Sequence, residues 1–275
     1  RKIFEDETFN FPWFKDPYKM KARLSPRFGI SHPITDNDVL YFYYGHFSQL
    51  PTFQYVYAKI NSKAQSTYQV FGNPNIQIIG HSSTQIEILE KTISVGTYPV
   101  FINKKVSVHV NTNAEVNITK IQNYKKHIYQ IYNLEVNQDN QSKFNSNVYS
   151  FAGGLIRNNL NINQMGENCE SHMHGLYLIK GHTHVDNHTA VNHTQPHSFS
   201  NELYKGIVDE NARAVFNGKI FVRPEAQKTN AFQSNQNINL SDEASIYTKP
   251  QLEIWADDVK CSHGCTVGQL DEEAL

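Results

Sequence analysis

The sequence predicts an all-β core that folds as a parallel β-helix, and three observations lead to this fold class. From about residue 68 onward, short runs alternate between apolar and polar residues and contain many β-branched side chains, which is typical of β-strands. Segments rich in Asn, Ser and Gly separate the runs, and no amphipathic helix is indicated between residues 70 and 270. A loose repeat passes through Ala212, Ala226, Ala244 and Val259.

The alternating runs follow one another along the whole core. They cover residues 76–79, 85–89, 106–110, 115–118 and 128–136, and then 214–222, 237–240, 244–247 and 251–254. A repeat without helices favours a parallel β-helix, because one rung cannot bury its apolar face alone and must stack on the next. Asparagine in the intervening turns tolerates a left-handed conformation. Periodicity alone leaves an antiparallel β-sandwich open as an alternative.

Three segments are expected along the chain. Residues 1–65 form an irregular, partly helical segment that is rich in aromatic residues and interrupted by prolines. Residues 66–270 form the β-helix core. Residues 271–275, Asp-Glu-Glu-Ala-Leu, are expected to begin a helix, because acidic residues favour a first helical turn. A chain that starts without Met and stops inside a helix is expected to be a fragment.

Composition narrows the classes of function. The 275 residues carry a formal net charge of −1, so nothing favours nucleic acid or an anionic membrane, which attract a basic excess. The sequence contains no apolar run long enough for a transmembrane helix, and residues 1–14 show no apolar stretch typical of a signal peptide. Three cysteines do not make a disulfide framework, and they indicate a reducing compartment, the cytoplasm. Of these, Cys169 is expected to be a small core residue.

Residues 261–265, Cys-Ser-His-Gly-Cys, contain the strongest candidate metal ligands. In a strand, Cys261, His263 and Cys265 project from one face. The outer two α-carbons then lie about 13 Å apart, whereas a thiolate–metal bond is about 2.3 Å long. One ion can therefore contact adjacent pairs at most, which suits a half-site that another chain completes. The alternative is that both cysteines point into the core, with His263 as a polar neighbour.

Seven histidines gather in one short segment: His172, His174, His182, His184, His188, His193 and His197. Imidazole binds zinc and iron, so a histidine-rich metal-binding protein is one alternative function. No known zinc spacing is present, and the opposing interpretation is a ladder of histidines that bond along stacked rungs.

A carbohydrate-active β-helix enzyme is the other alternative, with Asp257 and Asp258 as its candidate acids. Such enzymes need two carboxylates at a defined separation, whereas neighbouring residues of a strand face opposite sides. Residues 152–154, Ala-Gly-Gly, lack the lysine and the spacing of a phosphate-binding loop. The chain itself is therefore not expected to hydrolyse ATP.

Several long segments resemble the SufB/SufD family of iron–sulfur cluster assembly proteins. They are residues 186–197, 202–208, 214–220, 226–233 and 248–264. The last of these, Thr-Lys-Pro-Gln-Leu-Glu-Ile-Trp-Ala-Asp-Asp-Val-Lys-Cys-Ser-His-Gly, is similar to the SufD signature over nearly its whole length. The SufB branch carries a functional cysteine on the rung that matches residues 232–240, where this chain has none. The resemblance is therefore to the SufD branch, over about residues 70–275.

This resemblance implies a right-handed parallel β-helix that acts as a non-catalytic scaffold in the Suf complex. It implies pairing with a SufB-like paralogue, and a SufC-like ATPase held by a C-terminal helical segment that is largely absent here. His263 matches a histidine implicated in cluster assembly at the SufB–SufD interface, and Cys261 lies beside it. Cys265 departs from the family, where alanine is usual.

The resemblance also sets expectations for cofactors and self-association. The isolated chain is expected to hold no tightly bound cofactor. Iron or an iron–sulfur cluster binds transiently in the complex, shared by His263 and Cys261 with the partner, and flavin binding there stays open. Without its partner, the chain is expected to form a homodimer through a two-fold contact.

Overall fold

The chain divides into two compact units, Arg1–Leu50 and Pro51–Leu275. The computed structural model describes residues 8–9, 18–19, 27–33, 39–45, 70–92 and 98–269. In the first unit, two antiparallel pairs are formed, β1 (Thr8–Phe9) with β2 (Tyr18–Lys19) and β3 (Arg27–Pro33) with β4 (Val39–Gly45). The expected boundary at residue 65 and the expected helical turn over residues 271–275 lie outside the described residues.

The second unit contains two sheets. The eight-stranded sheet consists of β5 (Val70–Gly72), β6 (Asn75–Gly80), β8 (Val100–Val110), β10 (Ile128–Gln138), β12 (Leu155–Gln164), β14 (His184–His193), β16 (Arg213–Val222) and β18 (Ser245–Ile254). The seven-stranded sheet consists of β7 (Gln85–Lys91), β9 (Glu115–Asn123), β11 (Lys143–Ala152), β13 (Glu170–Ile179), β15 (Phe199–Val208), β17 (Asn230–Asn239) and β19 (Lys260–Gln269).

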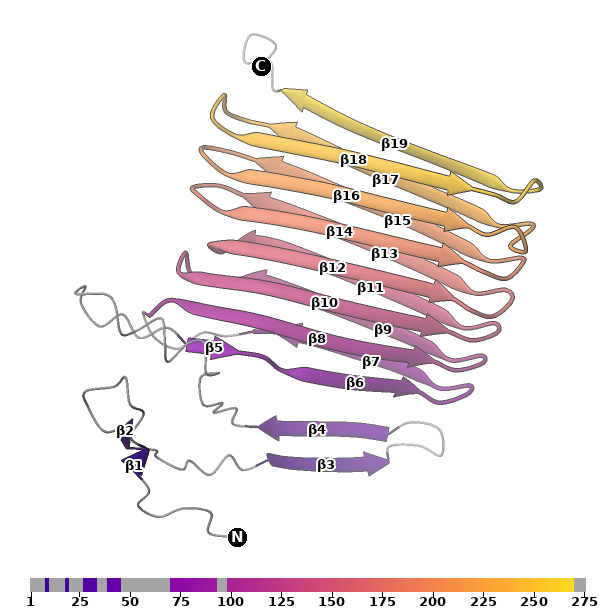
Figure 1. Cartoon of the computed structure of the whole chain (residues 1–275), viewed down its shortest axis with the longest axis horizontal. Coiled ribbons are helices and arrows are strands. Elements are labelled where there is room, and N and C mark those ends of the chain that lie inside the picture. The colour runs from indigo at the N-terminus through magenta and orange to yellow at the C-terminus, as the bar shows by residue number, and fades with distance from the viewer. Residues whose placement is uncertain are drawn as a thin grey trace. The chain divides into compact units, whose positions relative to one another are not determined.

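The two sheets are the two walls of a parallel β-solenoid. From β7 onward, consecutive strands alternate between the sheets, and every pairing within this unit is parallel. In Figure 1 each front strand runs to the right and the next strand returns behind it while the chain rises, which makes a right-handed coil. The predicted fold class is confirmed, and the parallel pairing excludes the antiparallel sandwich.

Each coil lies in register on the coil before it, although the coils differ in length. Tyr129 pairs with Leu155, so the coil between these two residues is short. Arg213 pairs with Ser245, so the coil between those two residues is longer. The repeat noted in the sequence marks half-coils: Ala212 and Ala244 directly precede β16 and β18, Val259 directly precedes β19, and Ala226 lies in the turn before β17. The three alanines are buried, so the repeat records the small residues that fit inside the corners of the coil.

The turns before the seven-stranded sheet share one backbone conformation. Six residues with positive φ each lie two positions before a strand of that sheet: Ser83, Asn113, Gln141, Asn168, His197 and Lys228. Only two of them are asparagine, so the expected asparagine turns account for part of the pattern. A positive φ costs most side chains some energy. Its repetition in six turns indicates that the register between coils determines the backbone conformation of the turn.

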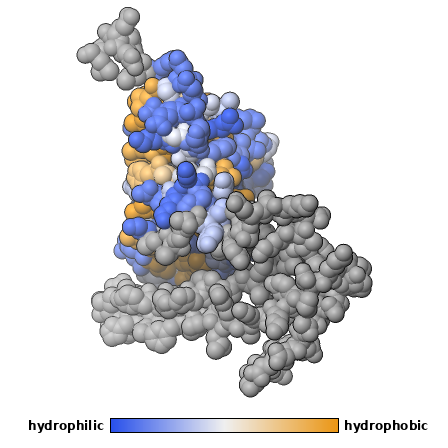
Figure 2. Space-filling view, turned by 90° about the vertical axis from the view of Figure 1, so that its left-hand side faces the viewer, coloured by the Kyte–Doolittle hydropathy of each residue, from blue (hydrophilic) through white to orange (hydrophobic). Residues whose placement is uncertain are grey.

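The core fills the space between the sheets. Buried and partly exposed residues alternate along strands such as β9, β14 and β16, because successive side chains of a strand face opposite sides. Fully buried side chains include those of Phe144, Ile156 and Ile220. Figure 2 shows that apolar side chains also gather along one side of the solenoid's surface.

One strand differs from its sequence prediction. The runs 244–247 and 251–254 belong largely to a single strand, β18, which contains Pro250. Proline has no N–H to donate to a sheet and is tolerated mainly in edge strands. β18 is the last described strand of its sheet, and this position explains why Pro250 does not end it.

Phe144→Ala is expected to lower the free energy of unfolding by about 3–5 kcal/mol, because it leaves a cavity between stacked coils. Phe144 is 0% exposed, whereas Phe232 in the same sheet is 37% exposed. Phe232→Ala is therefore the matched control, with an expected loss of about 1 kcal/mol. Urea denaturation followed by circular dichroism measures both. Equal losses would contradict this description of the core.

Candidate functional site

The candidate ligands lie on the last strand of the solenoid. β19 pairs with β17, and no described strand pairs with its other edge, which lies at the top of the solenoid in Figure 1. Cys261, His263 and Cys265 stand in register above Ala231, Gln233 and Asn235, all three of which are buried. The row of ligands therefore faces the interior of a coil that no described coil covers.

This open end leaves the three side chains with different surroundings. Cys261 is half-buried and packs against a small apolar cluster that includes Ile220 and Ala231, and Cys265 is half-buried against the main core. His263 is exposed. The row thus contains two thiols that pack against the core and one imidazole that is exposed to solvent.

The row does not form a closed metal site within this chain. Among the described residues, no group of three or more His, Cys, Asp or Glu side chains is arranged to hold a metal ion. Burial raises the pKa of the Cys261 thiol, against a smaller opposing effect of a hydrogen bond with the Ala231 backbone. The thiolate is the form that binds metal. In the chain alone, the raised pKa therefore favours the thiol, which is the weaker ligand.

A buried polar layer lies directly beneath the row. Gln233 Nε2 donates to Glu202 Oε2 at 2.7 Å, Asn235 Nδ2 donates to the Tyr177 hydroxyl at 3.0 Å, and Asn237 Nδ2 donates to Asn235 Oδ1 at 2.7 Å. Burial raises the pKa of Glu202 to about 7. Sequence reasoning missed this layer. Its signal is the polar residue at every second position of 233–237, which is unusual on the inner face of a buried strand.

The seven clustered histidines do not converge. His172 and His174 lie on β13, while His184, His188 and His193 lie on β14 of the other sheet. His182 and His197 lie in turns. Their contacts are with neighbours along or across the coils: His172 contacts Glu170, His188 lies 2.9 Å from Asp186, and the buried His193 contacts Ser200 at 2.9 Å. These three contacts lie within single coils and do not form the expected ladder of histidines along stacked rungs. A contact between adjacent coils is made by His174, whose Nδ1 lies 3.2 Å from Asn147 Oδ1.

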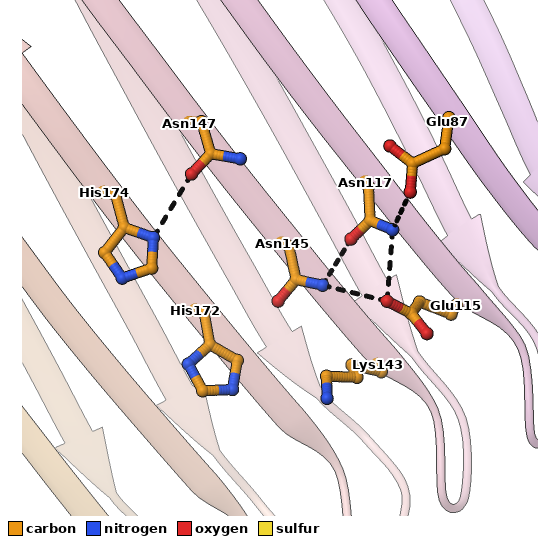
Figure 3. A pocket seen from close by; sticks show the side chains of 8 residues that line it. All are labelled: Glu87, Glu115, Asn117, Lys143, Asn145, Asn147, His172 and His174. Atoms are coloured by element: carbon orange, nitrogen blue, oxygen red, sulfur yellow. Dashed lines mark hydrogen bonds between the residues drawn. The ribbon is translucent and has the colours of Figure 1, made fainter.

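Two of these histidines line an open hollow on the outer face of the seven-stranded sheet. The hollow measures about 440 Å³, and Figure 3 shows the eight side chains that line it. Asn117 Nδ2 donates to the carboxylates of Glu87 and Glu115, and His174 Nδ1 lies 3.2 Å from Asn147 Oδ1. The polar groups are thus bonded from strand to strand, an arrangement that ties neighbouring coils together.

The remaining candidates have structural contacts. Asp258 pairs with Lys228, and Asp257 is exposed beside it, which gives no support to a catalytic pair of carboxylates. Cys169 is buried, as expected, and its Sγ lies 3.1 Å from the Asp139 carbonyl oxygen. Burial raises the pKa of the Cys169 thiol, which disfavours its reactive form.

Comparison with known proteins assigns the chain to a family. The model of the SUF system FeS cluster assembly SufBD core domain matches residues 60–275. The chain belongs to the SufB/SufD family. The resemblance noted in the sequence is thereby confirmed, and the site described above lies on the last described strand of a SufD-like solenoid.

Individual relatives agree with this assignment. An iron–sulfur cluster assembly SufBD family protein of Synechocystis sp. is 34% identical over 210 residues, which are 74% of this chain and 46% of that protein. The iron–sulfur cluster assembly protein SufD of Escherichia coli is 33% identical over 190 residues, or 68% and 44% of the two chains. A chloroplastic protein of Arabidopsis thaliana is 30% identical over 207 residues, or 74% and 43%. The SufD-like chain therefore spans less than half the length of these relatives.

Among the described residues of the SufD-like chain, none belongs to a helix long and apolar enough to cross a membrane.

Glu202→Gln is expected to remove one component of the pH dependence of stability. The pKa of Glu202 is raised from 4.5 to about 7, so between these values the folded chain keeps a proton that the unfolded chain releases. The protonated Glu202 side chain therefore contributes to the free energy of unfolding. This contribution is fully present below about pH 4.5 and is lost as the pH rises through about 7. A shift of this size corresponds to about 3 kcal/mol.

Denaturation at pH 5, 6, 7 and 8 measures this effect as the difference in free energy of unfolding between parent and variant. The free energy of unfolding of the variant should rise relative to that of the parent between pH 5 and 7, and the difference should level off toward pH 8. Glu225→Gln, at an exposed turn, is the control and should give a constant difference. A constant difference for Glu202→Gln as well would contradict the prediction.

Proposed function

We propose that this SufD-like chain is a scaffold subunit of a Suf complex and that it helps to assemble an iron–sulfur cluster at its open β18–β19 edge. The observation that carries the proposal is the placement of Cys261, His263 and Cys265 in one row on the last described strand. Family membership supports the role in cluster assembly.

The open edge supports pairing with another solenoid. A solenoid buries its apolar rows by stacking coils, and its terminal coil needs a cover. Unpaired strand edges also favour addition of another strand. Hydrophobic side chains at this end stay exposed, among them Val267, Tyr247 and Trp255. A SufB-like paralogue of the same fold is the partner that fits such an edge.

The chemistry of the row fits a site shared between two chains. Thiolate and imidazole are ligands for iron, and residues 261 and 265 are too far apart along a strand to hold one ion together. His263 and Cys261 would supply ligands from this side, with Cys265 in a lesser role. The partner would supply the rest, and iron and sulfide are here the cargo of assembly.

The chain contributes no ATPase chemistry in this proposal. Its sequence lacks a phosphate-binding loop, so hydrolysis would belong to a SufC-like subunit of the same complex. Flavin binding would likewise be a property of the assembled complex. The scarcity of cysteine supports a reducing compartment, and we propose the cytoplasm.

His263→Ala in the full-length protein is expected to leave folding and partner binding nearly unchanged and to reduce cluster formation severalfold. The residue is exposed, so its loss should cost about 0.5 kcal/mol or less in stability. The test is co-purification with the SufB-like and SufC-like proteins of the same organism, followed by a melting curve and by iron and sulfide content after reconstitution.

His182→Ala is the matched control, because His182 lies in a turn away from β19. It should form clusters as the parent complex does. Normal iron and sulfide content in the His263→Ala complex would refute the functional role. A large fall in melting temperature together with lost partner binding would instead assign His263 a structural role.

Without its paralogue, the chain is expected to form a homodimer through the same edge. Val267→Asp should weaken this dimer at least tenfold, because a charge at a 50% exposed apolar residue of β19 would be buried in the contact. Leu178→Asp, at a 39% exposed residue on the outer face of β13, is the control. Sedimentation equilibrium measures both. A monomeric parent at micromolar concentration, or equal effects of the two variants, would count against this interface.

A further inference from the structure

We propose that Glu202 and Gln233 form a buried relay that orients the His263 imidazole, with Gln233 Oε1 accepting a hydrogen bond from one ring N–H. The hydrogen bond is a property of the chain alone. Its consequence for cluster assembly rests on the function proposed above.

The three residues form one column across three neighbouring strands. Glu202 on β15 is in register with Gln233 on β17, and Gln233 is in register with His263 on β19. Adjacent strands lie about 4.8 Å apart, so residues in register can contact their neighbours directly. All three project from the interior side of the coil, so the His263 side chain is placed next to that of Gln233 along the column.

The lower contact fixes the direction of the glutamine amide. Gln233 Nε2 donates to Glu202 Oε2 at 2.7 Å, and both side chains are buried. Above about pH 7, where Glu202 is ionised, its carboxylate accepts but does not donate and so selects the amide orientation with the NH₂ group toward itself. The amide oxygen is then left for another partner.

That oxygen has no partner among the described residues. Gln233 Oε1 is buried without a hydrogen bond, a state that is unfavourable for a carbonyl oxygen. The residue in register on the open side is His263, which has at least one ring N–H at any pH. The unpartnered oxygen and the available donor are thus on adjacent strands of the same column.

The opposite wall keeps the amide in place. A methyl group at Gly218 would lie 2.3 Å from Gln233 Nε2 and 2.8 Å from the Phe216 ring. Only glycine at this position on β16 leaves room for the Gln233 side chain. The Gln233 amide is therefore confined by β16 on one side and held by its hydrogen bond to Glu202.

Such a contact would select one tautomer of the neutral imidazole. When one ring nitrogen donates its proton to an acceptor, the other nitrogen keeps a lone pair for a metal ion. Glu202 and Gln233 are positioning residues in this arrangement. They would present His263 to the open edge in its metal-binding form before iron arrives.

The experiment measures the tautomer of His263 in the full chain without metal. Histidine labelled with ¹⁵N gives ring-nitrogen chemical shifts that distinguish the two tautomers of the neutral imidazole. The spectra are recorded at about pH 8, above the pKa of about 7 of Glu202, and His263→Ala assigns the signals. Gln233→Met and Glu202→Met remove the acceptor and its anchor while keeping similar length. Gln236→Met, at an exposed position of the same strand, is the matched control, and melting curves check that each variant is folded.

One tautomer should dominate in the parent chain and in Gln236→Met, and the ratio of tautomers should shift severalfold toward that of free histidine in Gln233→Met and Glu202→Met. An unchanged ratio in folded Gln233→Met would overturn the relay. Iron and sulfide content of the reconstituted complex provides a separate readout, expected to fall severalfold in Gln233→Met. A tautomer shift combined with full cluster content in His263→Ala would uphold the hydrogen bond and refute the proposed function instead.

Discussion

Stacking in register is the constraint on which the rest of this structure depends. Each strand of the second unit pairs in parallel with the strand one coil earlier, and the pairing runs almost without interruption along each sheet. An inward position on one coil is therefore followed by an inward position on the next. Core packing, turn conformation and polar contacts all become columns, and a residue is best understood by what lies above and below it.

The columns explain why polar groups can be buried here. Lys120 is buried, and its pKa is lowered to about 7 by burial, yet it donates to Asn158 at 2.9 Å and lies over the Tyr132 ring. Asn158 in turn donates to Asn187 on the next coil. Burying a polar group is costly unless it is hydrogen-bonded, and register supplies a partner at a fixed position on each neighbouring coil. The Glu202–Gln233 pair follows the same rule near the end of the stack, where β19 is the last described strand.

The sequence predicted the strands and the fold class because both depend on local alternation. It also showed a loose repeat through Ala212, Ala226 and Ala244, and the structure places these residues at corners of the coil. It could not predict which side chains lie in one column, because the coils differ in length and each difference shifts the register. The histidine cluster illustrates the result: His172 and His184 are close in sequence, yet they lie on different sheets.

The candidate site was predictable to the same extent. A strand places Cys261, His263 and Cys265 on one face whatever surrounds it, so the row followed from alternation alone. Its supporting layer did not, because Gln233 and Asn235 lie one whole coil earlier in the chain and are joined to the row only by register. The runs 244–247 and 251–254 were predicted separately, and they join in one strand because proline is tolerated in a strand at the edge of a sheet.

In the proposed assembly, the open edge would couple pairing of the two chains to iron binding. Covering β19 with a partner removes water from Cys261, and burial alone raises the pKa of its thiol further and opposes binding-competent thiolate. A bound metal ion reverses this effect, because a coordinating thiol loses its proton. Pairing and iron binding are therefore coupled: iron should strengthen the contact between the chains by the same factor by which the contact strengthens iron binding. In the proposed assembly, such an edge would hold iron firmly only while both chains are paired.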